Sequence, residues 1–329
     1  MTQQFSRRRV LQTAAAFGMT LGGPTLALAQ TFPDKSKQIR GLSPFAVGST
    51  ADTLARAYAQ AMTEQLGTTV FIDNRPGAEG VLGMQAAKTS SPDGYTILFT
   101  TLSTQVVNPH LFKKLPYDPL TDFIPLAGTM RTALCMSASP SLPFKTAKEF
   151  FEAAKASPEK YSYASISATT RVAGEMAARA AGIKLLYVPY KSFGDLTSDL
   201  LSGRVDILMI DPPSVLPFVK QGLRVLGAAA PKRLVVFPDV PTFQELGYPG
   251  LEIPGWHAAY VPVGTPAPAV AALRDSVRQA SRSKYVTDYF SRFGMEPLDL
   301  AGDELAAFQK AEFEKWGKAV REAGLTGAM

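Results

Sequence analysis

The chain has 329 residues, with 34 Lys and Arg against 28 Asp and Glu, 46% hydrophobic residues and 19% charged residues. This composition is typical of a globular protein and excludes a disordered chain and a bundle of membrane helices. The length is enough for two domains or two lobes, and the single cysteine, Cys135, excludes an intramolecular disulfide and any zinc or iron–sulfur site built on cysteines.

Residues 1–29 have the three parts of an export signal. Arg7, Arg8 and Arg9 supply positive charge, a stretch of apolar or small residues follows, and Ala27-Leu28-Ala29 has the small-x-small pattern of a cleavage site. Because Pro24 interrupts this stretch, a cleaved signal is favoured over a membrane-spanning helix, which needs about 20 apolar residues.

The segment from Ser6 to Leu11 is similar to the twin-arginine motif, which indicates export of a folded protein. An ordinary secretory signal with one surplus arginine is the alternative. Either route predicts a periplasmic location. Without the signal the chain is only weakly basic and has no run of Lys and Arg, so nucleic acid is not an expected partner.

Beyond the signal, apolar runs alternate with helical patterns. A helix is predicted over residues 50–66, because Leu54, Tyr58, Met62 and Leu66 recur every four residues and Gly67 is a natural stop. Strands are expected at residues 69–72 and 95–100. Turns are expected at 74–77 and 92–94, with a short helix from Gly80 between them.

The same alternation resumes after Met130. Thr146 and Glu149 have the spacing of a capping box, which predicts a helix that ends at Ser157-Pro158. Further helices are expected at residues 170–181, 195–202, 266–293 and 303–321, and further strands at 161–166, 185–188, 205–210, 225–229 and 256–261.

Strands that alternate with helices indicate mostly parallel sheets flanked by helices, which is an α/β fold. A chain of this length fits two α/β lobes. Since no long flexible linker interrupts the pattern, we expect the lobes to be joined by short crossing strands.

The sequence lacks the motifs that are typical of several enzyme classes. His110 and His257 are far apart and have no partner at metal-ligand spacing, and no G-x-S-x-G elbow is present. Cys135 lies in an apolar run and is expected to be buried. Gly77, Gly80 and Gly83 lack the G-x-G of a dinucleotide loop, and there is no Walker lysine. We therefore predict no cofactor, no metal and no catalytic residues.

Three loops rich in small and hydroxyl residues follow predicted strands and lead towards helices. Helix N-termini at the ends of parallel strands carry unpaired N–H groups that suit an anion. Each hydroxyl could equally cap its own helix, but three such loops together indicate a neutral cradle for a carboxylate. The candidates are Phe45, Ala46, Val47, Gly48, Ser49 and Thr50 in the first loop, Thr100, Thr101 and Ser103 in the second, and Ser165, Thr169 and Thr170 in the third.

Two aspartates stand at comparable positions. Asp52 is in the first turn of its helix, four residues before Arg56, and Asp211 follows a strand and precedes two prolines. Each is either an acid favoured by the helix dipole or an acceptor that orients a water or the amine of a ligand.

A series of short segments in fixed order resembles the periplasmic substrate-binding proteins of tripartite tricarboxylate transporters, the Bug/TctC type. The resemblance covers essentially the whole chain after the signal. The segments are Arg40–Arg56, Asp73–Gly80, Pro92–Leu98, Asn108-Pro109, Leu115–Pro119, Val188–Lys191, Pro238–Thr242 and Gly264–Pro266.

The resemblance implies a two-lobed Venus flytrap fold, each lobe a mostly parallel sheet flanked by helices. It implies that residues 31–131 and 256–329 form the first lobe and residues 132–255 the second. It also implies that the three loops hold an organic acid between the lobes, that Asp52 matches the acid of the family, and that Tyr190 and Asp211 lie near the cleft.

Two departures from the family pattern fall at the expected cleft. Val47-Gly48-Ser49 stands where the family usually has Pro-Gly-Gly, and the third loop has no glycine and places Arg171 near the position of a family histidine. Arg171 either contacts a ligand carboxylate or is a solvated helix arginine.

The sequence thus predicts a monomeric solute-binding protein that closes on a small mono- or dicarboxylate and presents it to integral-membrane transporter subunits. An exported enzyme acting on a small acid, and a sensor module that presents its ligand to a signalling receptor, are the alternatives.

Overall fold

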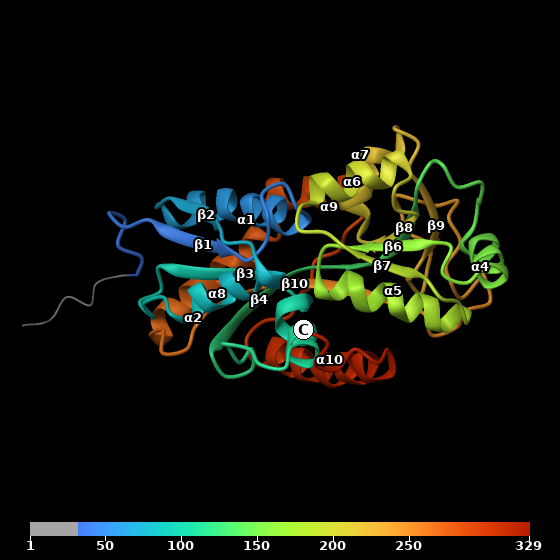
Figure 1. The fold of residues 1–329 in the computed structure, drawn as a ribbon. Coiled ribbons are helices and arrows are strands. Elements are labelled where there is room, and N and C mark those ends of the chain that lie inside the picture. Colours follow the sequence, from blue (N-terminus) through green and yellow to red (C-terminus); the bar gives the residue numbers. More distant parts are fainter. Residues whose placement is uncertain (1–31) are drawn as a thin grey trace, which may run out of the picture.

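The chain forms two lobes, each built on a five-stranded sheet with helices against both faces (Figure 1). The structure is a computed structural model that describes residues 32–329. The predicted export signal, with its arginines and its cleavage site, therefore lies outside the described residues. Among the described helices, none combines the length and the apolar character that a membrane crossing requires.

The two sheets share one strand order. The first consists, in spatial order, of β2 (Val70–Asn74), β1 (Ile39–Ser43), β3 (Thr96–Thr101), β10 (Pro254–Pro262) and β4 (Phe123–Ala133). The second consists of β7 (Leu186–Pro189), β6 (Ser162–Ser165), β8 (Ile207–Ile210), β5 (Cys135–Ala138) and β9 (Arg224–Ala228). In each sheet every strand runs in the same direction except the fourth, β10 or β5, which is antiparallel to both neighbours.

The helices fill the connections between strands. A 3₁₀ turn, η1 (Ala78–Gly80), precedes α2, and a π-helical turn, η2 (Ser103–Val107), follows β3. The α-helices are α1 (Thr50–Leu66), α2 (Val81–Lys88), α3 (Asn108–Leu111), α4 (Ala147–Ala156), α5 (Ala168–Ala181), α6 (Phe193–Ser202), α7 (Pro212–Val219), α8 (Ala267–Ala280), α9 (Lys284–Phe293) and α10 (Asp303–Glu322).

The buried apolar residues form three clusters. One lies between the first sheet and α1, α8 and α9, and another lies between the second sheet and α6 and α7. The remaining cluster covers the other faces of both sheets without a break, passing through Leu134 and Trp256. The lobes therefore share a core on one side of the molecule, while β3 and β8 are buried along their whole length.

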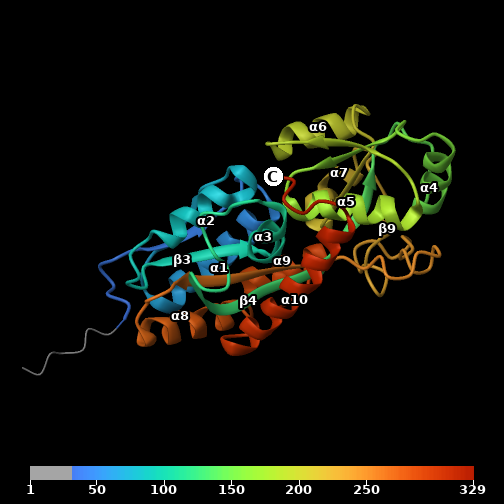
Figure 2. The same ribbon diagram turned by 60° about the horizontal axis from the view of Figure 1, so that its bottom comes forward.

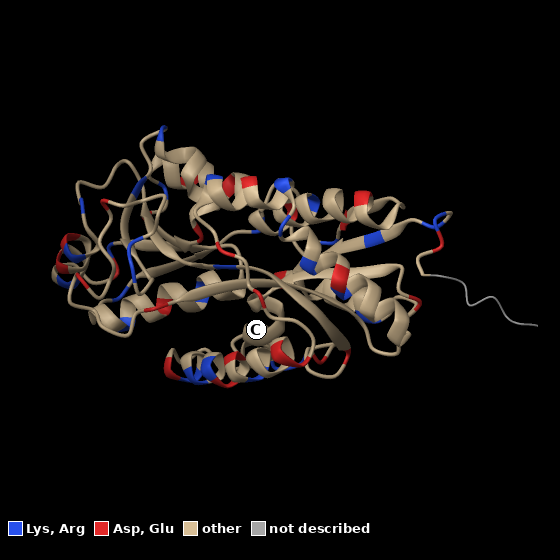
Figure 3. Ribbon diagram, turned by 180° about the vertical axis from the view of Figure 1, so that it is seen from behind, with Lys and Arg blue, Asp and Glu red and all other residues tan. Residues whose placement is uncertain are grey.

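Two crossing segments join the lobes, one at Leu134 between β4 and β5 and one at Ile253 just before β10. The Leu134 N–H donates to the Ile253 carbonyl (3.0 Å), and the Leu134 carbonyl accepts from the Ala229 N–H (2.8 Å). Helix α10 also crosses from the first lobe towards α5, where the Arg179 guanidinium donates to the Glu322 carbonyl (Figure 2). Seen from behind, α10 and its neighbours carry acidic and basic residues side by side (Figure 3).

Most predicted elements are confirmed, and the first helix has the predicted bounds. Leu54, Tyr58 and Met62 are buried, and Gly67 ends the helix in the left-handed region with φ 64°. The prediction of a single helix over residues 266–293 is wrong. This segment contains two helices, α8 and α9, because the Ser283 hydroxyl caps a new helix by accepting from the Val286 N–H (3.4 Å).

Other differences lie at helix starts and in missed strands. Helix α5 begins at Ala168 rather than at residue 170, because Ser167 is its N-cap. The capping box at Thr146 is only half formed, since the Glu149 carboxylate accepts from Lys145 rather than from Thr146. The sequence analysis also missed β1, β4, β5, α3 and α7.

Replacing Gly128 by alanine is predicted to destabilise the first lobe. A Cβ at Gly128 in β4 would lie 2.3 Å from the Leu298 carbonyl oxygen, a backbone atom that cannot turn aside. We expect Gly128→Ala to lower the free energy of unfolding by about 1–3 kcal/mol in urea titrations. Gly194→Ala in α6 is the control, because the nearest atom to its Cβ is 3.5 Å away. Equal stabilities of the two variants would contradict this packing.

Candidate functional site

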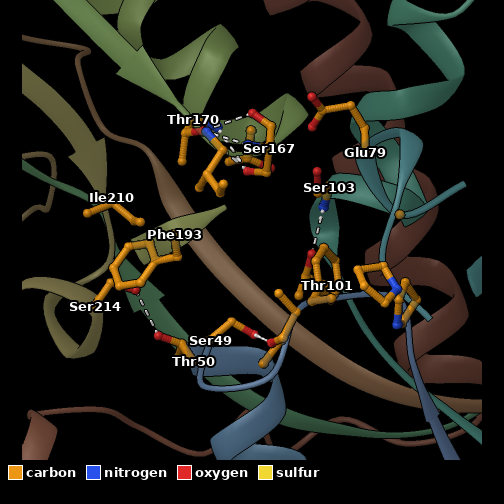
Figure 4. A pocket seen from close by; sticks show the side chains of 18 of the residues that line it. Ser49, Thr50, Glu79, Thr101, Ser103, Ser167, Thr170, Phe193, Ile210 and Ser214 are labelled. Carbon is orange, nitrogen blue, oxygen red and sulfur yellow. Dashed lines mark hydrogen bonds between the residues drawn. The ribbon is translucent and has the colours of Figure 1, made fainter. Parts of the chain in front are cut away.

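A cavity of about 540 Å³ lies between the two lobes (Figure 4). This volume is within the range of about 300–1,000 Å³ typical of small-molecule sites. The first lobe contributes, among others, Phe45, Ala46, Ser49, Thr50, Glu79, Thr101 and Ser103. The second lobe contributes, among others, Ile166, Ser167, Thr169, Thr170, Tyr190, Phe193, Ile210, Asp211 and Ser214. Apolar and hydroxyl-bearing side chains dominate these walls.

The loop before α1 is held in place by the buried carboxylate of Asp52. Its oxygens accept from the Gly48 N–H, from the Asn74 amide and from the Arg56 guanidinium, each at 2.9 Å. The Asn74 amide also donates to the Phe45 carbonyl (3.0 Å), so the loop is tied at both ends. Burial alone would raise the pKa of Asp52, but these three donors together lower it below its usual range.

The end of β3 leads into a tight turn that presents one hydroxyl to the cavity. The Ser103 N–H donates to Thr101 Oγ1 (3.2 Å), which turns the chain into η2. Ser103 is 2% exposed and lines the cavity, and within the described structure its hydroxyl has no hydrogen-bond partner. Thr100 is buried behind it and bonds to Thr104 at 2.5 Å.

On the opposite wall, α5 begins with a reciprocal capping box. Ser167 Oγ accepts from the Thr170 N–H (3.4 Å), and Thr170 Oγ1 accepts from the Ser167 N–H (3.0 Å). Between them Thr169 is 5% exposed, and its hydroxyl finds no partner in the part of the chain that the structure describes. A buried hydroxyl without a partner is costly, so a ligand that supplies one is favoured.

Direct hydrogen bonds across the cavity connect the lobes. The Thr50 hydroxyl donates to Asp211 Oδ1 (3.1 Å) and lies 3.0 Å from Ser214 Oγ. Asp211 also caps α7, where its carboxylate accepts from the Ser214 N–H (3.2 Å). Burial raises the pKa of Asp211, and the donors Ser214 and Thr50 oppose this shift.

The cavity brings together most of the residues predicted from the sequence. Those that line it are Phe45, Ala46, Ser49, Thr50, Thr101, Ser103, Thr169, Thr170, Tyr190 and Asp211.

The other predicted residues are not part of the lining. Val47 is 72% exposed at the tip of its loop, Gly48 has an open left-handed backbone with φ 82°, and Asp52 and Thr100 are buried behind the wall. Ser165 donates to the Tyr187 hydroxyl (3.2 Å) within the second sheet.

Arg171 also lies outside the lining. Its guanidinium stacks over the Tyr187 ring at 4.8 Å, and within residues 32–329 its Nε has no partner. Arg171 is thus partly buried and stacked on an aromatic ring, and it is not the solvated helix arginine that the sequence analysis considered.

Some lining residues were missed by the sequence analysis. Ser214 stands three residues after Asp211, which is the spacing of a cap and its N3 residue and could have been read from the sequence. Glu79 and Phe193 carried no such local signal, because each reaches the cavity only through the path of the folded backbone.

No catalytic or metal-binding group is assembled in this cavity. Residues 32–329 contain no cluster of His, Cys, Asp and Glu that could hold a metal ion. Burial raises the pKa of Cys135 to about 12 and lowers the pKa of His257, which lines the cavity, to about 3. Neither is suited to proton transfer or nucleophilic attack near neutral pH.

Comparison with known proteins points to one family. The sequence model of the family described as tripartite tricarboxylate transporter family receptor matches residues 54–325. Protein BugT of Bordetella pertussis is 31% identical over 320 residues, which cover 96% of this chain and 98% of BugT.

Solved structures agree with that result. The structure of a periplasmic transporter is 35% identical with a TM-score of 0.84, and the match covers 90% of this chain and 99% of the other. A protein of R. palustris solved with adipate is 28% identical with a TM-score of 0.85, over 90% of this chain and 99% of the other.

Asp52→Ala is predicted to destabilise the protein in a pH-dependent way. The substitution removes a buried carboxylate with three donors, so we expect a loss of roughly 2 kcal/mol in unfolding free energy at pH 7. A carboxyl with a lowered pKa stabilises the fold above its ordinary value of 3.8, and this contribution is lost as the pH falls through the lowered value.

Urea unfolding at several pH values measures this effect. The difference in unfolding free energy between the wild type and Asp52→Ala should become smaller as the pH falls, because the wild type loses the contribution of the ionised carboxylate. The exposed Glu64, on the same helix, is the control, and Glu64→Ala should change stability by about 0.5 kcal/mol or less. A gap that stays constant down to the lowest pH would contradict the role given to the ionised carboxylate.

Proposed function

This chain belongs to the tripartite tricarboxylate transporter receptor family, and we propose that it captures a small organic acid in its cleft for uptake by a membrane transporter. The family is one of solute-binding receptors and not of enzymes. The similar R. palustris protein was solved with adipate, a carboxylate, which supports an acid as the ligand of this chain.

The observation that carries the proposal is a pair of unpartnered hydroxyls on facing walls. Ser103 of the first lobe and Thr169 of the second are at least nine-tenths buried, and each lines the cavity without a hydrogen bond within the described chain. Because a hydroxyl donates readily to an ionised acceptor, a carboxylate ligand would satisfy two groups that have no partner within the described chain.

Helix N-termini add donors of the same kind. Helix α1 begins at the cavity with Ser49, Thr50 and Ala51 in the wall, and α5 begins there with Ser167 and Thr169. First-turn amides of a helix have no partner within it, and the helix dipole favours negative charge at this end. The proposed ligand contacts are the lining residues Phe45, Ala46, Ser49, Thr50, Thr101, Ser103, Thr169, Thr170, Tyr190 and Asp211.

Binding at such a site favours a closed arrangement of the lobes. A ligand shifts a conformational equilibrium only by the difference between its affinities for the two states, so it must contact both lobes. We propose that the described residues 32–131 and 256–329 form one lobe and 132–255 the other, since the chain changes sheets near Leu134 and just before β10. The crossing segments would then form the hinge.

A screen of organic acids tests the proposal directly. We expect mono- or dicarboxylates to raise the melting temperature of the purified protein. Ser103→Ala and Thr169→Val should each weaken binding by about tenfold, because each removes one hydrogen bond of about 1.5 kcal/mol to a charged group. Calorimetric titration measures the change in Kd.

The matched control is Ser43→Ala. Ser43 is also a fully buried serine whose hydroxyl has no partner within residues 32–329, but it does not line the cavity. Its replacement should leave the affinity unchanged. A screen in which no acid stabilises the protein, or an equal loss of affinity in Ser43→Ala, would count against the proposed site.

We further propose that the chain is exported to the periplasm by the twin-arginine route. Replacing both Arg7 and Arg8 by lysine should then leave the protein in the cytoplasm, since this route depends on the arginine pair. Cell fractionation and immunoblotting measure the distribution. An unchanged periplasmic amount would point to the ordinary secretory route.

A further inference from the structure

Glu79 lies in the wall of the cavity on an unusual stretch of backbone. It and Ala78 are consecutive non-glycine residues in the left-handed region, with φ of 55° and 47°. The Asn108 amide donates to the Glu79 carbonyl (3.0 Å), and the Gly80 N–H donates to the Gly77 carbonyl (3.0 Å). Strain of this kind persists only where neighbouring contacts hold it, and it occurs often at ligand clamps.

This backbone aims the Glu79 side chain across the cleft. The carboxylate points into the cavity, above Ser103 and towards the turn of Ser167 and Thr170 that opens α5 (Figure 4). Its Oε2 is buried and has no hydrogen-bond partner in the described structure. Burial raises the pKa of Glu79, while Arg171 and the Ala168 amide at the start of α5 oppose this.

The Glu79 carboxylate thus faces the first amide of α5 from the opposite wall, where it competes with a ligand carboxylate. Helix α7 offers no substitute, because Pro212 and Pro213 have no N–H at its first turn and the Asp211 carboxylate caps it. Helices α1 and α6 begin without a capping carboxylate, with Ser49 and Ser192 as their N-caps. Of the two, α1 brings the hydroxyls of Ser49 and Thr50 to the wall, whereas α6 brings the apolar Phe193. The Asp211 carboxylate reaches the first turn of α1 only through the Thr50 hydroxyl (3.1 Å).

The charged side chains of the lining leave Glu79 without a cationic partner in the cavity wall. Among the described residues that form it, the acids are Glu79 and Asp211 and the sole Lys or Arg is Lys191, which is exposed. Arg171 lies behind the wall, stacked on Tyr187, and within residues 32–329 Glu79 takes part in no ion pair. A ligand group beside Glu79 therefore meets a negative charge that lacks a direct cationic partner.

We propose that Glu79 is a specificity-determining residue that selects acids whose second end carries an N–H or O–H donor over dicarboxylates. The inference rests on the proposed function, that the cleft binds an organic acid. The ligand carboxylate would lie at the start of α1, and an amino, amide or hydroxyl group at the other end would donate to Glu79 Oε2. A second carboxylate there would face a like charge and would compete with Glu79 for the Ala168 amide at the start of α5.

Matched ligand series test this selection. Dicarboxylates of four to eight carbons are titrated calorimetrically against the ω-amino and ω-hydroxy monocarboxylates of the same length. At the length that binds best, the wild type should bind the amino or hydroxy acid at least tenfold more tightly than the dicarboxylate. Glu79→Gln, which keeps the shape and removes the charge, should reduce this ratio at least tenfold.

Two further variants make the test specific. Glu79→Gly removes the side chain and relieves the left-handed strain, so it should lose the preference even if glutamine disturbs the loop. Asp195→Asn removes one exposed charge outside the lining and should keep the wild-type ratio.

The outcomes separate the two proposals. A wild type that binds the dicarboxylate as tightly as the amino and hydroxy acids, or a ratio unchanged by both Glu79 substitutions, overturns the selection while the proposed function stands. If no acid in the series or in the wider screen binds, the proposed function fails and the selection fails with it.

Discussion

The cleft of this protein is governed by the unpaired amides at the first turn of each helix that opens onto it. One side chain at each start satisfies the third amide: Ser49 for α1, Ser167 for α5, Ser192 for α6 and Asp211 for α7. The earlier amides have no partner within the helix. At α7 two prolines remove these donors, and at α5 the Glu79 carboxylate lies opposite them. The residues at each helix start thus determine which backbone amides can bind a ligand.

Two acids of the first lobe, Asp52 and Glu79, show how partners decide the role of a charge. Asp52 is surrounded by three donors at 2.9 Å, so its carboxylate organises the loop before α1 and has little left for a ligand. Glu79 has an oxygen with no partner among the described residues, which is costly in the free protein. A group of this kind gains most when a ligand donor reaches it.

The arrangement of the lobes follows from one topology used twice. Each sheet takes its reversed strand from the chain as it enters from the other lobe: β5 directly after β4, and β10 after the second sheet is complete. The sequence shows no internal repeat, so the similarity lies in strand order and not in residues. Because the crossing segments also bond to one another at Leu134, rotation of the lobes would be concentrated there.

Elements whose signals act within about four residues could be predicted from the amino-acid sequence alone. The periodicity of Leu54, Tyr58 and Met62 with the stop at Gly67 defined α1, and hydroxyl residues after strands marked the walls of the cleft. The family resemblance added the order of the lobes. Such signals depend only on residues that are close together along the chain, so they can be recognised in the sequence without a structure.

Only the tertiary structure decided which of these residues face one another. Thr50 and Asp211 are 161 positions apart and meet because two sheets place their helix starts at one cleft. A tertiary contact turned Asp52 inward to Asn74, and a left-handed turn aimed Glu79 across the cavity. The direction of a side chain depends on the backbone path and on partners distant in sequence, so residue type and spacing cannot specify it.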